Sequence, residues 1–201
     1  MIKVLNLYAG IGGNRKLWTD VDVVAVENDC RIASWYEQQF KEDKVIIGDA
    51  HQYLLEHYNN FDFIWSSPPC QTHSSFRHNI CVKLRGTKPE YPDMRLYQEI
   101  IFLKHHFKGK WAVENVNPYY EELMPAQKMQ RHLFWTNFPI AKKEFEKDKL
   151  REAQVPDLQY KYGLYIGGSN IKNKRQVLRN CVLPELGLHI FKCAFDDEGK
   201  E

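Results

Sequence analysis

The residues best suited to chemistry lie in the segment Ser66-Ser67-Pro68-Pro69-Cys70-Gln71. Its two prolines restrict the backbone, so the cysteine that follows them is presented rigidly. A free cysteine is more often a small buried hydrophobe than a reactive group. Here, however, the residues after Cys70 are Gln, Thr, His and Ser rather than apolar core residues. We therefore interpret Cys70 as a nucleophile, which must react as its thiolate.

A second candidate is Glu114, in Ala112-Val113-Glu114-Asn115-Val116. A glutamate at the end of a strand is often only a solvated surface charge. The flanking apolar residues instead indicate that Glu114 is at least half buried and faces the same cleft as Cys70. Because burial raises the pKa of a carboxyl group, Glu114 is expected to stay protonated and to donate a hydrogen bond.

Three further segments each follow a predicted strand. In the first, Tyr8-Ala9-Gly10-Ile11-Gly12-Gly13, the glycines either let the backbone approach a ligand or simply make a tight turn. Glu27 follows the next strand and is either a ribose-binding group or a solvated charge. Asp49 either accepts from an adenine amino group or caps the next helix. Their order at successive strand ends favours a single nucleoside-like cofactor.

The elements that must position these residues alternate along the first two-thirds of the chain. Short apolar runs predict strands at residues 2–7, 21–26, 44–47, 61–65, 111–113 and 132–137. Amphipathic stretches predict helices at residues 14–18, 31–40, 50–57 and 94–107. This alternation predicts an α/β fold with a mostly parallel twisted sheet and helices on both faces.

The pattern changes after Pro139. Residues 140–173 are polar and show no sustained periodicity, so we predict an irregular insertion there. Regular spacing of apolar residues returns over residues 174–188, interrupted by Pro184.

Composition limits the class of protein. The 201 residues, 43% hydrophobic and 27% charged, are typical of a soluble globular domain. A net charge of +2 excludes nucleic-acid binding by bulk charge alone, although basic residues gather at 104–110 and 172–175. The five cysteines form no Cys-x-x-Cys pair, so no metal site is expected. With no signal peptide and no apolar run of ~18 residues, we expect a cytoplasmic protein with reduced thiols and no membrane association.

Taken in order, the motifs resemble those of the DNA cytosine-C5 methyltransferase family, whose fold is Rossmann-like. Residues 5–13 resemble its first motif, and Pro69-Cys70-Gln71 with Ser74 resembles its nucleophile loop. Glu114-Asn115-Val116 is similar to its Glu-Asn-Val motif. Gln127-Lys128-Met129-Gln130-Arg131 resembles its Gln-x-Arg-x-Arg motif, with Met129 where the family usually has the first Arg. Residues 180–184 look like its late Asn-x-Val segment.

The resemblance implies an enzyme that methylates cytosine C5 in DNA with S-adenosylmethionine. Cys70 would add to C6 of a flipped cytosine, Glu114 would bind N3 and the exocyclic amine, and Arg131 would steady O2. The residues implied for cofactor binding are Tyr8, Ala9, Gly10, Ile11, Gly13, Glu27, Asn28, Asp49, Ala50, Pro68, Asn180 and Cys181. Those implied for double-stranded DNA, in or beside a loop that could close over it, are Gln71, Ser74, Arg77, Lys83 and Arg85.

The sequence departs from the family where a target-recognition region of substantial size is usual. We assign residues 1–137 and 174–195 to the S-adenosylmethionine-binding catalytic domain, and residues 138–173 to a short target-recognition-like insertion. Either the site read is very short, or a partner supplies specificity, or methylation depends only loosely on sequence. Such compactness would suit a phage or mobile element in a bacterial cell that marks its DNA against restriction.

Three alternatives compete with this interpretation. An amino-methyltransferase would share Ser67-Pro68-Pro69, but it would carry an aromatic residue in place of Cys70. A tRNA cytosine-5 methyltransferase of the same family is compatible with the short insertion. A catalytically inactive DNA-binding subunit is disfavoured, because such a copy would not need Cys70, Glu114 and Arg131 together.

Overall fold

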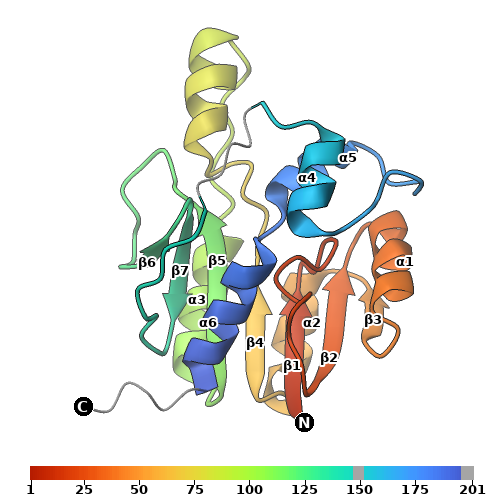
Figure 1. The fold of residues 1–201 in the computed structure, drawn as a ribbon. Helices are drawn as coiled ribbons and strands as arrows, with labels where there is room; N and C mark the ends of the chain where they lie inside the picture. Colours follow the sequence, from red (N-terminus) through yellow and green to blue (C-terminus); the bar gives the residue numbers. More distant parts are fainter. Residues whose placement is uncertain (147–151, 196–201) are drawn as a thin grey trace.

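The computed structural model describes residues 1–146 and 152–195. Their strands form a seven-stranded sheet in the order β3-β2-β1-β4-β5-β7-β6 (Figure 1). The strands β1 to β5 are parallel, β7 runs antiparallel to β5, and β6 runs antiparallel to β7. The bounds are β1 Ile2–Leu7, β2 Val21–Glu27, β3 Lys44–Ile47, β4 Phe63–Ser66, β5 Lys110–Val116, β6 Gln127–Met129 and β7 His132–Thr136. The predicted α/β fold class is confirmed.

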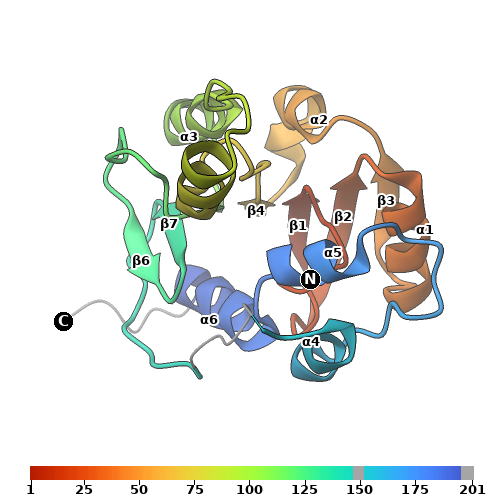
Figure 2. The same cartoon turned by 90° about the horizontal axis from the view of Figure 1, so that it is seen from above.

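Helices cover both faces of the sheet, with α2 and α3 on one face and α1 and α6 on the other (Figure 2). Successive side chains of β1 point to opposite faces of the sheet. Leu5 packs in the core under α2 and α3, whereas Val4 packs in the core under α6. Burial on both faces explains why the strands are continuously apolar. The helices are α1 Cys30–Gln39, α2 Ala50–His57, α3 Arg95–His106, α4 Val155–Tyr162, α5 Lys174–Asn180 and α6 Pro184–Phe195, with the short η1 Tyr58–Asn60 and the π-helix η2 Arg77–Leu84. Among the described residues, no helix has the length and apolar character of a membrane span.

The strand order determines where a ligand can bind. β1 pairs with β2 on one side and β4 on the other, so the chain switches direction across the sheet at this point. In open parallel sheets a crevice forms there, at the carboxyl ends of the strands. The loops after β1 and β4 meet at this edge, and α4 and α5 lie above it (Figure 1).

The insertion is more regular than expected. The prediction that residues 140–173 are irregular is wrong for α4, which packs Leu158 against Ile11 and Trp35 in one apolar cluster. The helix has Pro in its first turn and a capping box in which Asp157 takes part, and Gly163 caps its C-terminus. An eight-residue helix is too short to show a clear period of apolar residues, so these capping residues are its only local signals in the sequence. Residues 147–151 of the insertion lie outside the described residues.

Two other expectations about helices need correction. The expected helix at residues 14–18 is absent: residues 14–17 form turns, and the Arg15 guanidinium donates to the Trp18 carbonyl and the Asp43 carboxylate. The regular stretch at 174–188 is two helices, α5 and α6. Pro184 lacks a backbone N–H and therefore starts α6 rather than continuing α5.

The packing of α6 on the loop after β1 yields a stability prediction. A Cβ on Gly187 would lie 2.4 Å from the Asn14 carbonyl oxygen and 2.6 Å from its Cα, which are backbone atoms that cannot move aside cheaply. We expect Gly187→Ala to destabilise the fold by about 1–3 kcal/mol, the usual cost of overpacking. Thermal unfolding measures this loss. Gly168→Ala is the control, because a Cβ there meets no atom within 4 Å; an equal loss in both variants would contradict the packing argument.

Candidate active site

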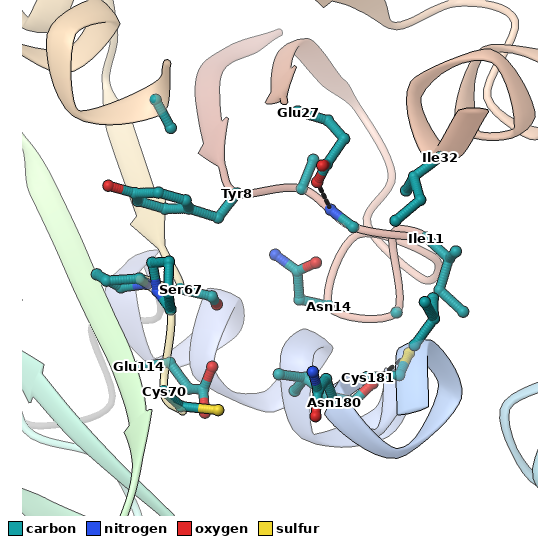
Figure 3. Close-up of a pocket in the computed structure, with 18 of the residues that line it drawn as sticks. Tyr8, Ile11, Asn14, Glu27, Ile32, Ser67, Cys70, Glu114, Asn180 and Cys181 are labelled. Carbon is teal, nitrogen blue, oxygen red and sulfur yellow. Dashed lines mark hydrogen bonds between the residues drawn. The ribbon is translucent and has the colours of Figure 1, made fainter. Parts of the chain in front are cut away.

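A cavity of about 390 Å³ lies at the carboxyl ends of the central strands (Figure 3). Every residue predicted to bind the cofactor lines it, and so do Cys70, Gln71, Glu114 and Arg131. In Figure 3, Glu27 and Tyr8 lie on one side of this space, and Cys70 with Glu114 lies on another. The fold therefore brings together groups that the sequence separates by more than a hundred positions.

Glu27 holds the loop after β1 against the end of β2. One of its oxygens accepts from Gly10 N at 2.9 Å and the other accepts from Asp29 N at 2.9 Å. Gly10 has φ of 55°, a backbone conformation that glycine adopts without strain. Each carboxylate oxygen of Glu27 retains a second lone pair, which can accept from a ligand hydroxyl in the cavity.

Tyr8 is fixed by a buried network that the sequence did not reveal. Its hydroxyl donates to Glu99 Oε1 at 2.6 Å, and Ser66 donates to the other oxygen at 2.6 Å. His51 Nδ1 lies 2.9 Å from the same carboxylate. Burial, followed by the charge of Glu99, raises the pKa of Tyr8. The tyrosine ring is therefore a neutral, immobile wall of the cavity.

Asp49 fulfils one of the two roles left open for it and remains available for the other. It caps α2 by accepting from the backbone N–H groups of His51 and Gln52. It also lines the cavity, close to Ala50. On the far side, a Cβ on Gly13 would lie 2.1 Å from Cys181 Sγ, so the loop after β1 sits directly against the segment that follows α5.

Cys70 sits in a loop that backbone contacts hold in place. Asn115 Nδ2 donates to the Pro68 carbonyl at 3.0 Å, and the Cys70 carbonyl accepts from the next turn, at Ser74 N. Burial, followed by the negative charge of Glu114, raises the pKa of the Cys70 thiol to about 11. The thiol is therefore protonated at neutral pH when no substrate is bound.

Glu114 is buried on β5, as expected, but its ionisation is not as expected. Burial is the largest single cause and raises the pKa of this carboxyl, whereas the charge and the hydrogen bond of His132 lower it. A hydrogen bond from Ser67 and the charge of Arg131 lower it further, so the net shift is downward. The prediction that Glu114 has a raised pKa is wrong, because it considered burial without the partner on β7.

Arg131 lies in the turn between β6 and β7, where Gln130 has φ of 52°. Its Nη2 donates to the carbonyl oxygens of Arg179 and Cys181, each at 3.0 Å. These contacts anchor the guanidinium between Glu114 and the end of α5. The positive charge of Arg131 also opposes the rise in the pKa of Cys70.

The residues predicted to bind DNA are only partly brought together. Gln71, Ser74 and Arg77 line a second cavity of about 920 Å³, which also includes Cys70 and the basic residues Lys174, Arg175 and Arg179. Arg77 forms a two-pronged ion pair with Glu90 at 2.8 and 2.9 Å. Lys83 and Arg85 are exposed and line neither cavity. Within residues 1–146 and 152–195, no group of His, Cys, Asp or Glu side chains could hold a metal ion.

Comparison with known proteins settles the family. The sequence matches the family model of the C-5 cytosine-specific DNA methylases over residues 2–118. The chain belongs to this family. Cytosine C5 is therefore the methyl acceptor and S-adenosylmethionine is the methyl donor.

One solved structure shares the fold of this chain, and a second is similar over part of it. The methyltransferase EhMeth from Entamoeba histolytica matches with a TM-score of 0.57 and 9% identity, over 100% of this chain and 99% of that chain. The DNMT2 E260A/E261A/K263A mutant from Spodoptera frugiperda matches with a TM-score of 0.43 and 25% identity, over 61% of this chain and 38% of that chain. No match was found among curated proteins.

The cavity of this C5 methylase fits the methyl donor chemically. Glu27 offers carboxylate lone pairs for two hydroxyl groups, as a ribose requires, and Tyr8 offers a fixed aromatic face. Ile11 and Ile32 add apolar surface on the opposite wall (Figure 3). Ile32 was not predicted, although its place in the first turn of α1, just beyond Glu27, was a usable signal.

Proposed function

We propose that the chain methylates C5 of cytosine in duplex DNA through a covalent bond between Cys70 and C6. The observation that carries this proposal is the convergence of Cys70, Glu114 and Arg131 on the cavity that the cofactor-side residues also line. A cytosine ring bound there would have Cys70 as its nucleophile, Glu114 at the edge that carries N3, and Arg131 beside its carbonyl oxygen.

Glu27, Tyr8 and the loop after β1 would hold S-adenosylmethionine. When bound, this group supplies an electrophilic methyl on its sulfonium. The role of the protein is to orient the methyl toward C5 and to exclude water from the reacting atoms.

The residues of the chain would activate the ring. C5 of cytosine is a weak nucleophile, so a thiolate must first add to C6 and push electrons toward C5. Glu114 would hydrogen-bond N3 and the exocyclic amine, and Arg131 would stabilise charge at O2. Loss of the C5 proton and release of Cys70 then complete the exchange.

The second cavity supports a nucleic-acid substrate. Cys70 and Gln71 line both cavities, so a strand that crossed the second could deliver a flipped base to the first. Lys174, Arg175 and Arg179 place positive charge where phosphates would lie. We also propose that residues 138–173 contribute the short recognition element, because Val155 of α4 and Ile171 line the second cavity.

A cofactor-affinity measurement tests the assignment of Glu27. We expect Glu27→Gln to weaken binding of S-adenosylhomocysteine about 10- to 100-fold, because the amide group would turn a donor toward the N–H of Gly10 or Asp29. Isothermal titration calorimetry measures the affinity. Glu185→Gln, on the exposed side of α6, is the matched control. Unchanged affinity in Glu27→Gln would remove this residue from the cofactor site.

Trapping separates the DNA and tRNA substrates. Duplex DNA and tRNA, each carrying 5-fluorocytosine, are incubated separately with the protein and labelled S-adenosylmethionine. Fluorine at C5 prevents the elimination step, so a covalent adduct accumulates on the true substrate. We expect the adduct with DNA. An adduct with tRNA alone would make the chain a tRNA methyltransferase, and no adduct with either would overturn the covalent mechanism.

A further inference from the structure

Glu114 is joined to a histidine that the proposed chemistry does not yet use. In the antiparallel pairing of β5 with β7, Glu114 lies opposite Phe134, and Val116 lies opposite His132. Glu114 and His132 are therefore diagonal neighbours on the same face of the sheet. Nδ1 of His132 is hydrogen-bonded to Oε1 of Glu114.

The hydrogen bond between His132 and Glu114 is buried. His132 is 2% exposed and Glu114 is 6% exposed, so the two side chains are largely shielded from solvent although both line the cavity. With one proton between them, such a pair can exist as carboxylate with imidazolium or as carboxylic acid with imidazole. Other titratable or charged groups that act on Glu114 or share its side of the cavity are Cys70 after β4, Arg131 before β7 and Cys181 after α5.

Cytosine makes a demand that a carboxylate alone cannot meet. N3 of neutral cytosine carries a lone pair, so it repels an ionised carboxylate and requires a hydrogen-bond donor. The lowered pKa of Glu114 means that the free protein presents the ionised form at neutral pH. A proton must therefore reach Glu114 when the base enters.

We propose that His132 is a positioning residue that supplies this proton through Glu114, an inference that rests on the proposed function. The Nδ1–H bond of His132 breaks and an O–H bond forms on Glu114, leaving a neutral imidazole. As the thiolate adds to C6, the Glu114 O–H gives its proton to N3. When the C5 proton passes to solvent water and Cys70 is expelled as a thiolate, N3 returns its proton to Glu114, which returns it to Nδ1. The proton of the Cys70 thiol passes to solvent water when the thiolate forms.

The same transfer prepares the nucleophile. The negative charge of Glu114 is one of the causes that raise the pKa of Cys70. Once Glu114 is neutral, that cause is removed, and the thiolate forms at lower pH. One proton movement therefore links base recognition to activation of Cys70.

The pH dependence of kcat tests this role with His132→Gln, which retains an N–H donor but has no proton to release. Glu114 must then supply a proton of its own, so we expect the alkaline limb of the profile to move to lower pH. The variant should be about tenfold slower than wild type near pH ~8.5 and close to it near pH ~6. His105→Gln, on the exposed end of α3, is the control. A purely structural role would lower kcat equally at every pH, and that result would overturn the proposal.

A second measurement does not depend on activity. Carbon-13 NMR of the labelled Glu114 carboxyl, assigned by its absence in Glu114→Gln, follows its ionisation directly. In His132→Gln the charge of His132, one of the causes that lower the pKa of Glu114, is lost while burial remains, so the carboxyl should titrate at higher pH than in wild type. An unchanged titration would overturn the proposal. If the wild type methylates no cytosine, the proposed function fails, while this titration still decides whether the two residues share a proton.

Discussion

Replacing Cys70 with serine is expected to eliminate the adduct with 5-fluorocytosine DNA and to reduce methyl transfer by about 10³-fold or more. A serine hydroxyl in the same loop keeps the hydrogen-bonding capacity but is far harder to ionise than a thiol. Single-turnover transfer of a labelled methyl group measures the loss. Cys30→Ser is the control, since Cys30 is exposed at the start of α1. An adduct that survives in Cys70→Ser would show that another residue attacks the base.

The raised pKa of Cys70 predicts how the reactivity of its thiol depends on pH. With a pKa of about 11, the thiol of the free protein is almost fully protonated at pH ~8, and its thiolate fraction rises about tenfold for each pH unit below that value. Alkylation of Cys70 by iodoacetamide in the free protein should therefore accelerate from neutral to alkaline pH. A rate that is already high and flat at neutral pH would mean that the thiolate is preformed.

The fold and most of the site could be predicted because their signals are local. The apolar runs that form strands, such as residues 2–7 and 44–47, are short, and glycine follows closely after each of them. A candidate site residue lies in the loop directly after each of these two strands. α4 was missed because a single short helix shows capping residues rather than periodicity.

The ionisation of Glu114 could not be predicted in the same way. Its pKa depends on which residue of β7 lies diagonally across from it, and that depends on the register of an antiparallel pair joined by a turn. A shift of β7 by one residue would move His132 to the opposite face of the sheet. Glu99 is a similar case, since it lies on α3 and reaches Tyr8 across 91 positions of sequence.

Replacing Glu114 with glutamine is the second large-effect prediction, and it should move two measurements in opposite directions. Methyl transfer should fall about 10²- to 10⁴-fold, because an amide can donate to N3 but cannot deliver a proton as the thiolate adds. Alkylation of Cys70 in the free protein should become faster, because the negative charge that raises its pKa is gone.

Loss of the fold would also expose Cys70, so the affinity for S-adenosylhomocysteine must be measured on the same sample. Removing one partner of a buried pair is costly, and His132 is left without its carboxylate. The double variant Glu114→Gln with His132→Gln removes both members and should restore stability without restoring transfer. Glu121→Gln, an exposed glutamate beyond β5, provides the matched control. Unchanged alkylation in a folded Glu114→Gln protein would mean that Glu114 does not govern the ionisation of Cys70, and the coupling between base recognition and nucleophile activation would fail with it.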